Sequence, residues 1–513
     1  MAVQQSTPGH ADLVFRNATV VDGTGAPRRV ADVAVAGDRI VAVGDCGAVR
    51  AARSVEAAGR VLAPGFIDAH THDDGYLLVH RDMTPKVSQG ITTVVTGNCG
   101  ISVAPLLSGA PPQPLDLLGP AELFRFDTFA QWLDALRATP ANVNVVPLLG
   151  HSTLRVRAMP RLDRAATEAE IAAMREEVGL AMAAGAFGVS TGTFYPPAAA
   201  ATEAEIIAVC EPVRTHRGLY STHLRDETDH IVPSIEEALR IGRALDCPVV
   251  FSHHKVAGKR NHGRSVETLG LLADAARLQP LCLDCHPYPA TSTMLRLDRV
   301  RQSTRTMITW STGYPAAGGR DFHELMHELG LDEDALLEKL RPAAAIYFIM
   351  DERDVARIAQ FPLTVFGSDG LPFDPRPHPR QWGTFPRILA RMVREDQLMT
   401  LETAIHKMSG LAAQQYGLRD RGQIVPGAFA DLVLFDADHV QDRATFEDPL
   451  QLSTGIHGVW VNGAQVWEQD AQASSNGRAL PAFTGRVLQR RPVQPSSAAR
   501  PGARQGTATP TPS

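Results

Sequence analysis

Residues 65–74 read GFIDAHTHDD, an apolar run that ends in two histidines followed by two carboxylates. In a β-strand, residues i and i+2 point to the same side. The imidazoles of His70 and His72 can therefore reach one point just beyond the end of a strand. Neutral imidazole is a good ligand for zinc and similar divalent ions. The stretch predicts a buried strand that ends at a metal site, and two unrelated surface histidines are the alternative that the pair alone leaves open.

The middle of the chain, about residues 63–420, alternates short apolar runs with helical patterns. Strands are expected near residues 66–68, 91–96, 143–149, 187–190, 219–223, 248–253, 281–285 and 363–369, and helices near 166–184, 203–216, 233–245 and 266–278. Repeated strand–helix units of this length are typical of a parallel (β/α)8 TIM-like barrel, in the α/β fold class. In such a barrel the chemistry lies at the carboxyl ends of the strands.

Both ends of the chain have a β-rich pattern instead. Residues about 10–62 and 421–480 alternate short β-like runs with turns, and Asn462-Gly463 is a typical hairpin turn. We therefore expect one small β-sandwich domain built from both termini, next to a catalytic barrel. Residues 485–513 are rich in Pro, Ser, Ala, Arg and Gly and are expected to form a disordered tail.

One segment does not fit the strand–helix repeat. About 75 residues separate Cys285 from Leu363, which is far longer than a usual connection in a barrel. We interpret about residues 286–360 as an insertion over the barrel mouth. A mobile lid and a helical subdomain that only packs on the barrel are both open interpretations.

Composition narrows the class of protein. The chain has 513 residues, 44% of them apolar, which is too long for one simple core and ordinary for an enzyme of several domains. The net charge of −6, without a long basic run, argues against a nucleic-acid partner. The absence of a long apolar run and of a visible secretory signal predicts a cytoplasmic protein without a membrane partner. Its six scattered cysteines suggest free thiols or a metal ligand rather than disulfides.

Polar side chains recur where the expected strands end. Besides the first histidine pair, these strand-end residues are Cys99, His151, His223, His253, His286 and Asp369. A single buried histidine is more often a satisfied core residue than a ligand, and a single cysteine usually packs as a small hydrophobe. A barrel brings all its strand ends onto one ring, however. A ring of His, Cys and Asp predicts a metal site.

These residues, in this order, resemble the amidohydrolase superfamily, and more closely the N-acyl-D-amino-acid deacylases, or D-aminoacylases. The resemblance covers about residues 10–480 and is carried by residues 64–74, 90–102, 221–227, 252–255 and 367–370. A His-x-His pair alone is a weak signal, whereas Gly97-Asn98-Cys99-Gly100 together with the other segments is a strong one. The resemblance implies zinc-dependent hydrolysis of the amide bond of N-acyl-D-amino acids to a carboxylate and a free D-amino acid.

The resemblance also implies a set of metal ligands. Cys99, His223 and His253 look like the ligands of one tightly held Zn²⁺. His70 and His72 look like ligands of a second, weaker position, with the sulfur of Cys99 between the two. Many amidohydrolases have a carboxylated lysine as this bridge, and an anionic thiolate is a fitting zinc ligand in its place.

Asp369 looks, by the same resemblance, like the catalytic carboxylate. It would act as general base toward a metal-activated water that attacks the amide carbon, and then as general acid toward the leaving amine. The residues alone leave open that Asp369 merely caps a helix. His151 is expected to help stabilise the tetrahedral oxyanion.

Substrate contacts are implied by the resemblance at five further positions. Lys255 and Arg380 look like binders of the substrate carboxylate, and Tyr195 and Ser292 are expected near the substrate. From sequence alone, both cations are equally well explained as solvated loop charges. Where family members commonly read Tyr-Pro-Tyr, this chain has His286-Pro287-Tyr288, so His286 is expected either to replace the first tyrosine toward substrate or to alter the substrate range. His254 is interpreted as a neighbour of the ligand His253.

Three alternatives remain at this point. The first is a cyclic-amide hydrolase of the dihydroorotase or hydantoinase type, against which Cys99 argues because a bridging lysine is expected there. The second is a deacylase specific for N-acyl-D-glutamate or N-acyl-D-aspartate, and the third is a non-catalytic binding protein on the same scaffold. The preference for D over L substrates rests on the resemblance alone, and a monomer or small homo-oligomer is expected.

Overall fold

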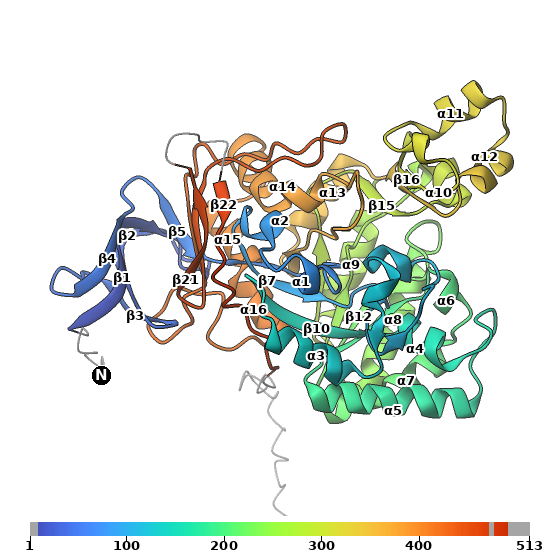
Figure 1. Cartoon of the computed structure of the whole chain (residues 1–513), viewed down its shortest axis with the longest axis horizontal. Helices are drawn as coiled ribbons and strands as arrows, with labels where there is room; N and C mark the ends of the chain where they lie inside the picture. The colour runs from blue at the N-terminus through green and yellow to red at the C-terminus, as the bar shows by residue number, and fades with distance from the viewer. Residues whose placement is uncertain (1–8, 471–476, 491–513) are drawn as a thin grey trace, which may run out of the picture.

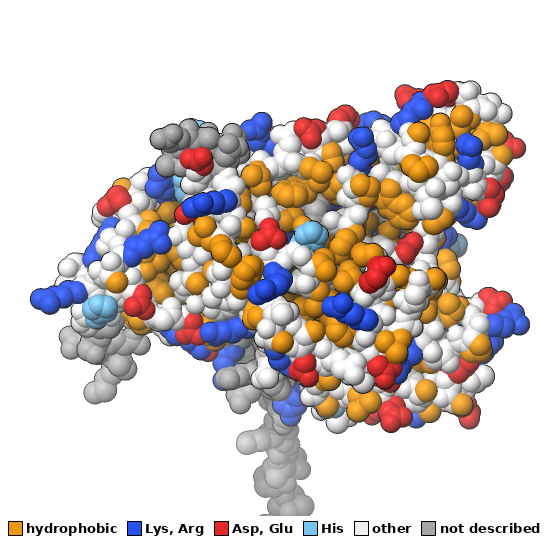
Figure 2. Space-filling view, viewed as in Figure 1, with side chains coloured by type: hydrophobic (Ala, Val, Ile, Leu, Met, Phe, Trp, Pro, Cys, Tyr) orange, Lys and Arg blue, Asp and Glu red, His pale blue; other side chains and the backbone are white. Residues whose placement is uncertain are grey.

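The computed structural model describes residues 9–470 and 477–490 of the chain. Figure 1 shows a β-rich part built from the blue and red ends of the chain, a central barrel, and a yellow-green projection beside it. On the face shown in Figure 2, basic and acidic side chains are interspersed rather than gathered by sign. Within the described ranges, no helix combines the length and the apolar character that a membrane crossing requires.

Eight parallel strands form the central sheet, in the order β18-β14-β13-β12-β11-β10-β7-β6. They are β6 (Phe66–Asp68), β7 (Ile91–Thr96), β10 (Asn144–Gly150), β11 (Gly188–Gly192), β12 (Leu219–His223), β13 (Val249–Phe251), β14 (Leu281–Cys285) and β18 (Thr364–Phe366). The edges approach each other, because the amide of Ala69 donates to the carbonyl of Phe366 at 3.1 Å and Thr71 bridges to Gly370. The expected TIM-like barrel is thereby confirmed.

Helices cover the outside of the barrel and connect its strands. They include α1 (Tyr76–Val79), α2 (Thr84–Val87), α3 (Phe129–Ala138), α4 (His151–Ala158), α5 (Glu168–Ala184), α6 (Pro196–Ala199), α7 (Glu203–Thr215), α8 (Ile231–Leu245), α9 (Ser265–Ala275), α13 (Glu352–Gln360), α14 (Arg380–Arg387), α15 (Leu401–Met408) and α16 (Gly410–Tyr416). Helix α5 begins at a capping box of Thr167 and Glu170. Helix α8 buries Ile231, Ile235 and Leu239 on one face, as the helical period of the sequence predicts.

The two ends of the chain form one continuous mixed sheet of nine strands. The N-terminal strands are β1 (His10–Val20), β2 (Arg29–Ala36), β3 (Arg39–Gly44), β4 (Arg50–Glu56) and β5 (Val61–Pro64), and the C-terminal strands are β19 (Leu432–Phe435), β20 (Ile456–Val461), β21 (Ala464–Gln469) and β22 (Gly477–Ala479). Strands β5 and β19 pair antiparallel and join the two halves. Phe15 and Trp460, one from each half, pack edge to face at 4.7 Å between ring centroids.

The segment between β14 and β18 contains an antiparallel sheet of its own, in the order β15-β17-β16. Its elements are β15 (Ala290–Met294), α10 (Leu297–Gln302), β16 (Thr306–Ser311), α11 (Phe322–Leu329), α12 (Glu333–Leu340) and β17 (Ala343–Phe348). Ile308, Phe322 and Tyr347 belong to a separate hydrophobic core in this insertion. In Figure 1 it projects from the barrel at the upper right. That the insertion moves as a lid stays a prediction.

The end of the chain departs in part from the expected disordered tail. Residues 485–490 lie along β10, where the amide of Val145 donates to the carbonyl of Arg486 at 2.8 Å and the amide of Leu488 donates to the carbonyl of Val145 at 2.9 Å. Leu488 is buried. The expectation rested on the average composition of residues 485–513, which is poor in large apolar residues, whereas Val487 and Leu488 near its start are apolar. Residues 491–513 lie outside the described residues.

Candidate metal centre and active site

Four side chains converge at the carboxyl ends of the barrel strands. Donor atoms of His70, Cys99, His253 and Asp369 all lie within 4.8 Å of one another, and all four residues are buried. The sulfur of Cys99 lies 3.3 Å from Nε2 of His70 and 3.2 Å from Nε2 of His253. Oδ1 of Asp369 lies 3.2 Å from Nε2 of His72. The first histidine pair therefore shares one site with the residues that follow β7, β13 and β18.

The backbone is unusual at three of these four positions. The φ angles of Cys99, His253 and Asp369 are 54°, 33° and 50°, in the left-handed region that residues other than glycine seldom adopt. Such conformations concentrate at functional sites, where the surrounding structure holds them. Gly97 has a φ of 72°, and a Cβ there would lie 1.9 Å from the carbonyl oxygen of Leu148. The turn before Cys99 therefore requires glycine.

A second group of potential ligands adjoins the first. Donor atoms of His223, Glu227 and His253 also lie within 4.8 Å of one another. The imidazoles of His223 and His253 meet at 4.4 Å between centroids and 82° between planes. Among the described residues, neither ring nitrogen of buried His223 has a hydrogen-bond partner. His253 thus belongs to both groups. No donor of the described residues forms a hydrogen bond with a ring nitrogen of His223, so its lone pair is available to a metal ion.

Two carboxylates orient the histidines. Nδ1 of His70 lies 3.2 Å from Oδ1 of Asp284. Nδ1 of His253 lies 3.2 Å from Oε1 of Glu227 and 2.7 Å from Nζ of Lys255. The backbone amide of His253 also donates to Asp284 at 2.8 Å. A histidine that donates Nδ1–H to a carboxylate presents the lone pair of Nε2 to a metal. Both Nε2 atoms face the sulfur of Cys99, which is the geometry of a ligand set.

Sequence reasoning missed Glu227 and Asp284 as site residues. Asp284 lies near the end of β14, and Glu227 follows the strand-end His223 by four residues, so both had the right position in the barrel. Acidic residues are common in loops after strands, and this signal alone does not single them out. Only their burial, at 3% and 1% exposure, separates them from solvated loop charges.

Burial sets the protonation states of the site. It lowers the pKa of His70 to about 3 and holds the pKa values of His223 and His253 below the usual range, so the imidazoles are neutral. Burial also raises the pKa of the Cys99 thiol well above its usual value. For Asp369, burial acts to raise the pKa, but the guanidinium of Arg380 and nearby imidazoles outweigh it and hold the pKa well below its ordinary value.

The donor set fits a zinc-like cation. Zinc takes thiolate, neutral imidazole and carboxylate ligands, usually four at a time. Neutral imidazoles, an ionised carboxylate and a converging sulfur are all present. His223 adds two buried ring nitrogens without a hydrogen-bond partner in the described part of the chain, and its Nε2 lies 3.6 Å from Oε2 of Glu227. A bound cation also reverses the effect of burial on a thiol, because it favours the thiolate.

The substrate residues expected from the sequence lie around this cluster. Nη1 of Arg380 lies 2.8 Å from Oδ2 of Asp369 and 3.2 Å from Nε2 of His286. Nη2 of Arg380 donates to the carbonyl of Ser292 at 3.2 Å. The ring of Tyr195 packs 4.9 Å from that of His223. The structure therefore brings these residues together at one mouth.

Lys255 and His254 follow His253 and have different surroundings. Nζ of Lys255 lies 2.5 Å from Oε1 of Glu227, so its charge is already paired beside the site. Nε2 of His254 lies 3.1 Å from Oγ1 of Thr268, on helix α9. The ring of His254 is therefore engaged by a residue outside the cluster, whereas His253 faces Cys99.

His151 was expected in the site, but its ion-pair contact is with a residue of helix α7. It begins helix α4, and its Nε2 lies 3.7 Å from Oε1 of Glu205, on helix α7. Glu205 is also paired with the buried guanidinium of Arg155. The ion pair next to His151 thus belongs to the packing of α4 against α7, and the role of His151 toward an oxyanion stays a prediction.

A buried lysine holds the stretch that carries the first histidine pair. Nζ of Lys86, on α2, lies 2.9 Å from Oδ2 of Asp68, 2.9 Å from Oγ of Ser368 and 3.3 Å from Oδ2 of Asp73. Lys86 and both carboxylates are fully buried. The ammonium therefore links residues on both sides of the histidines to the loop after β18.

Replacing this lysine is expected to destabilise the fold strongly. Lys86→Met leaves two carboxylates buried without their cation, a change that costs about 3–5 kcal/mol in proteins. The free energy of unfolding, measured by denaturant titration, is expected to fall by that amount. Lys259→Met, at an exposed position, is the matched control and is expected to stay within about 0.5 kcal/mol of the parent. A loss below about 1 kcal/mol for Lys86→Met would contradict this role.

Comparisons with known proteins agree with this geometry. The model of the amidohydrolase family matches residues 53–299 and 242–467. The chain is 64% identical to the N-acyl-D-aspartate deacylase of Alcaligenes xylosoxydans xylosoxydans over 92% of this chain and 97% of that protein. A D-aminoacylase structure with a binuclear metal centre, activated by one metal and attenuated by the second, matches with a TM-score of 0.91 and 56% identity over 94% of this chain and 100% of the other.

A third relative has been solved with a ligand that mimics the tetrahedral intermediate of its reaction. It is the N-acyl-D-glutamate deacylase of Bordetella bronchiseptica, in complex with zinc and a phosphonate inhibitor, at 43% identity and a TM-score of 0.87 over 94% of this chain and 100% of that chain. The family model and these relatives each cover far more than half of the sequence. The chain therefore belongs to the amidohydrolase family and, within it, to the D-aminoacylases.

Proposed function

We propose that this protein hydrolyses the amide bond of N-acyl-D-amino acids to a carboxylate and a free D-amino acid, in a zinc-dependent reaction. The observation that carries the proposal is the convergence of His70, Cys99, His253 and Asp369 at the mouth of the barrel. Relatives that are 64% and 56% identical are an N-acyl-D-aspartate deacylase and a D-aminoacylase. A cyclic-amide hydrolase is less well supported, because Cys99 stands at the position where a bridging lysine is expected in that class.

Residues of both groups, together with His72, would hold the metal. Cys99, His223 and His253 are proposed as ligands of a tight zinc site, and His70 and His72 as ligands of a weaker second position that shares the sulfur. The distances of 3.3 and 3.2 Å from this sulfur to one histidine of each set support the bridging role. Zinc bound there supplies Lewis-acid chemistry, which polarises the amide carbonyl and acidifies water.

Asp369 is proposed to move the proton. Its carboxylate is ionised because Arg380 lies 2.8 Å away, so it can accept a proton from the attacking water. As the C–N bond of the amide breaks, Asp369 returns that proton to the leaving nitrogen, which departs as the amine of the amino acid. The distance of 3.2 Å between Oδ1 of Asp369 and Nε2 of His72 supports this role, because it brings the carboxylate next to a proposed metal ligand.

Two cations are proposed to bind the α-carboxylate of the substrate. Lys255 and Arg380 flank the cluster from the loops after β13 and β18, and each already holds one protein carboxylate. A substrate carboxylate would share these cations with Glu227 and Asp369, through the free donors of the guanidinium and the ammonium. His286, next to Arg380, is proposed to take the position of the tyrosine that family members commonly have there. A small molecule is thus the proposed partner, and a monomer or small homo-oligomer remains a prediction.

A substrate panel tests this function. Amino acid release is measured from paired N-acetyl-D- and N-acetyl-L-amino acids, before and after a chelator, and again after zinc is restored. Release from the D-isomers that is lost with the chelator and regained with zinc is expected. Release from L-isomers alone, or turnover that survives complete metal removal, would contradict the proposal. Preferential opening of a hydantoin or dihydroorotate ring would instead support the cyclic-amide alternative.

We further propose that the preferred amino acid has an acidic side chain, as in N-acyl-D-aspartate. The ring of Phe194 stacks on that of His223 at 5.2 Å between centroids and 17° between planes. The guanidinium groups of Arg296 and Arg299 lie 4.4 Å from the centroid of the same Phe194 ring. Two positive charges therefore stand one aromatic ring away from a proposed metal ligand, where a carboxylate side chain would find them.

Truncating one of these arginines is expected to change the preference for the side chain. Arg299 contacts Glu227 of the proposed site, whereas Arg296 pairs with Asp298 at 2.9 Å, outside the grouped metal donors. Arg296 is therefore the arginine to replace. Arg296→Met is expected to lower kcat/KM for N-acetyl-D-aspartate about ten- to a hundredfold relative to N-acetyl-D-leucine, because a hydrogen bond to a charged group contributes about 1.5–3 kcal/mol. Arg353→Met, at a side chain that is 83% exposed, is the control. An unchanged ratio between the two substrates would remove Arg296 from side-chain recognition.

A further inference from the structure

One buried carboxylate contacts a proposed ligand of each metal position. Both side-chain oxygens of Asp284 lie next to Nδ1 of His70, Oδ1 at 3.2 Å and Oδ2 at 3.3 Å. Oδ1 also accepts the backbone amide of His253 at 2.8 Å. The backbone carbonyl of Asp284 accepts the amide of His254 at 2.7 Å. A single residue of β14 thus holds one histidine proposed for the weaker position and one proposed for the tight position.

Asp284 lies behind the metal donors and not among them. The sulfur of Cys99 lies 3.3 Å from Nε2 of His70, whereas Asp284 lies at Nδ1, on the other edge of the same ring. Asp284 does not belong to either group of donors found in the described residues. Within the same residues, it is also the one polar partner of this Nδ1. Asp284 therefore selects the tautomer of His70 whose Nε2 lone pair faces the sulfur.

The two histidines depend on Asp284 in different ways. The ring of His253 has other polar partners at Nδ1, which are Glu227 at 3.2 Å and Lys255 at 2.7 Å. What Asp284 holds in His253 is the backbone, whose φ of 33° lies in the left-handed region. The negative charge of Asp284 therefore acts on the ring of His70, while its oxygen acts as an acceptor for the backbone of His253.

We propose that Asp284 is a positioning residue that sets the affinity of the weaker metal position through His70 and supports the tight position through the backbone of His253. The inference rests on the proposed zinc-dependent function and assigns that function a residue that controls the two positions separately. Asp284→Asn keeps an oxygen for the amide of His253 but replaces the negative charge beside His70 with a neutral group that includes an N–H donor. Asp284→Ala removes the acceptor as well.

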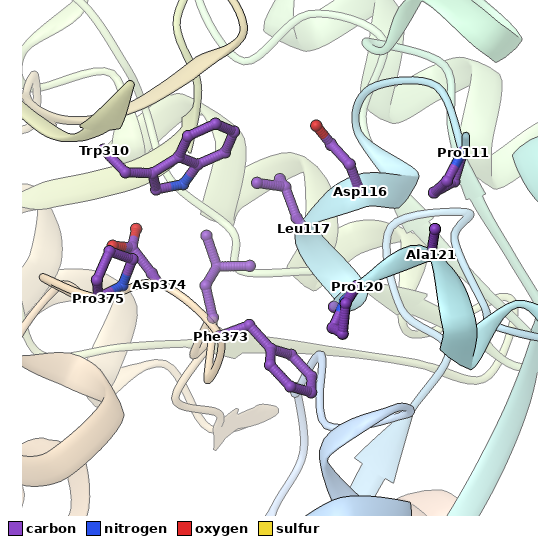
Figure 3. Close-up of a pocket in the computed structure, with 11 residues that line it drawn as sticks. Pro111, Asp116, Leu117, Pro120, Ala121, Trp310, Phe373, Asp374 and Pro375 are labelled. Atoms are coloured by element: carbon purple, nitrogen blue, oxygen red, sulfur yellow. The ribbon is translucent and has the colours of Figure 1, made fainter. Parts of the chain in front are cut away.

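Asp374 offers a buried carboxylate for comparison. It accepts the backbone amide of Arg376 at 3.0 Å, much as Asp284 accepts that of His253. It lines a cavity of about 510 Å³ between the loop after β7, strand β16 and the loop after β18, where Figure 3 shows it beside Pro375. None of the residues that line this cavity is a grouped metal donor. Asp374→Asn therefore makes the same chemical change at a carboxylate that holds no proposed ligand.

A zinc titration tests the inference without relying on activity. Metal is removed from each protein, folding is checked by circular dichroism, and Zn²⁺ is added in competition with a chelator of known affinity. The parent is expected to bind two zinc ions with separate dissociation constants. Asp284→Asn is expected to weaken the weaker position by about 10–100-fold, the usual effect of losing an outer-shell partner, and to leave the tighter one nearly unchanged. Asp284→Ala is expected to weaken both positions, and Asp374→Asn neither.

A double variant separates positioning from a general structural effect. His70→Ala removes the ring that Asp284 holds, so adding Asp284→Asn to it is expected to cause no further change in the affinity of the remaining zinc. A further loss in the double variant would overturn the inference. So would equal weakening of both positions in Asp284→Asn, an unchanged weaker position, a parent that binds one zinc ion, or an Asp284→Asn chain that does not fold.

Amide hydrolysis is measured separately on the zinc-loaded parent with N-acetyl-D-aspartate. If the parent binds two zinc ions and hydrolyses no N-acetyl-D-amino acid, the proposed function fails, and the titrations still decide the role of Asp284. If hydrolysis is found but the titrations give one of the contrary results, the proposed function stands and the role of Asp284 falls.

Discussion

Cys99→Ala is expected to lose its bound zinc and, with it, amide hydrolysis. The sulfur lies 3.3 Å and 3.2 Å from Nε2 of His70 and His253, so it contributes to both proposed metal positions at once. As a thiolate, Cys99 would also supply negative charge to offset the cation, since burial keeps the imidazoles neutral. Loss of an outer-shell partner already costs about 10–100-fold in metal affinity. Loss of this ligand is expected to lower zinc affinity and kcat/KM by more than about a hundredfold.

Metal content measured beside activity makes this result interpretable. Zinc per chain is determined by atomic spectroscopy after dialysis, and kcat/KM is measured with N-acetyl-D-aspartate. Cys210→Ala removes another fully buried cysteine, on the core side of α7 and not among the grouped metal donors, and is expected to retain zinc and turnover. Circular dichroism checks that both variants are folded. A Cys99→Ala variant with full zinc content and full turnover would refute the bridging thiolate.

The barrel could be predicted because parallel strands buried on both faces appear in the sequence as short apolar runs. Once the strands are predicted, the polar residues at their carboxyl ends can be located as well. In strand β12, Leu219–His223, four buried residues lead to a histidine at that end. The strands of the insertion carry no such signal. Strand β15, Ala290–Met294, reads ATSTM, and its place is fixed by pairing with β17 rather than by its own pattern.

The proposed ligands were easier to single out in the sequence than the groups beside them. Cys99 and His253 stand at strand ends and are uncommon residue types, so their position and chemistry coincide. Glu227 and Asp284 are common residue types, and their function arises from contacts with His253 that only the folded chain creates. The pairing of Arg380 with Asp369 likewise joins a strand end to the start of α14. The residues that surround the proposed ligands are therefore identified by distances between side chains and not by spacing in the sequence.

Asp369→Asn is expected to keep zinc and to lose turnover by about 10²–10⁴-fold, the range that a positioned acid–base group contributes. Asparagine has nearly the same shape but neither accepts the proton of the attacking water nor returns it to the leaving nitrogen. Cys99, His223 and His253, the proposed ligands of the tight site, are untouched. The loss is therefore expected in kcat, with KM changed much less, because ground-state contacts to the substrate remain.

Asp420 provides a matched control, because its backbone has the same left-handed conformation as that of Asp369. Asp420 also has a left-handed conformation, with a φ of 58° against 50° for Asp369, and it is exposed on a loop before β19. Asp420→Asn makes the same chemical change in the same conformation and is expected to leave kcat unaltered. Zinc content is measured for both variants, so that metal loss and loss of proton transfer are separated. If Asp369→Asn binds zinc and its kcat stays within tenfold of the parent, Asp369 is not the proton carrier, and the base must be sought among the other carboxylates of the mouth, Glu227 and Asp284.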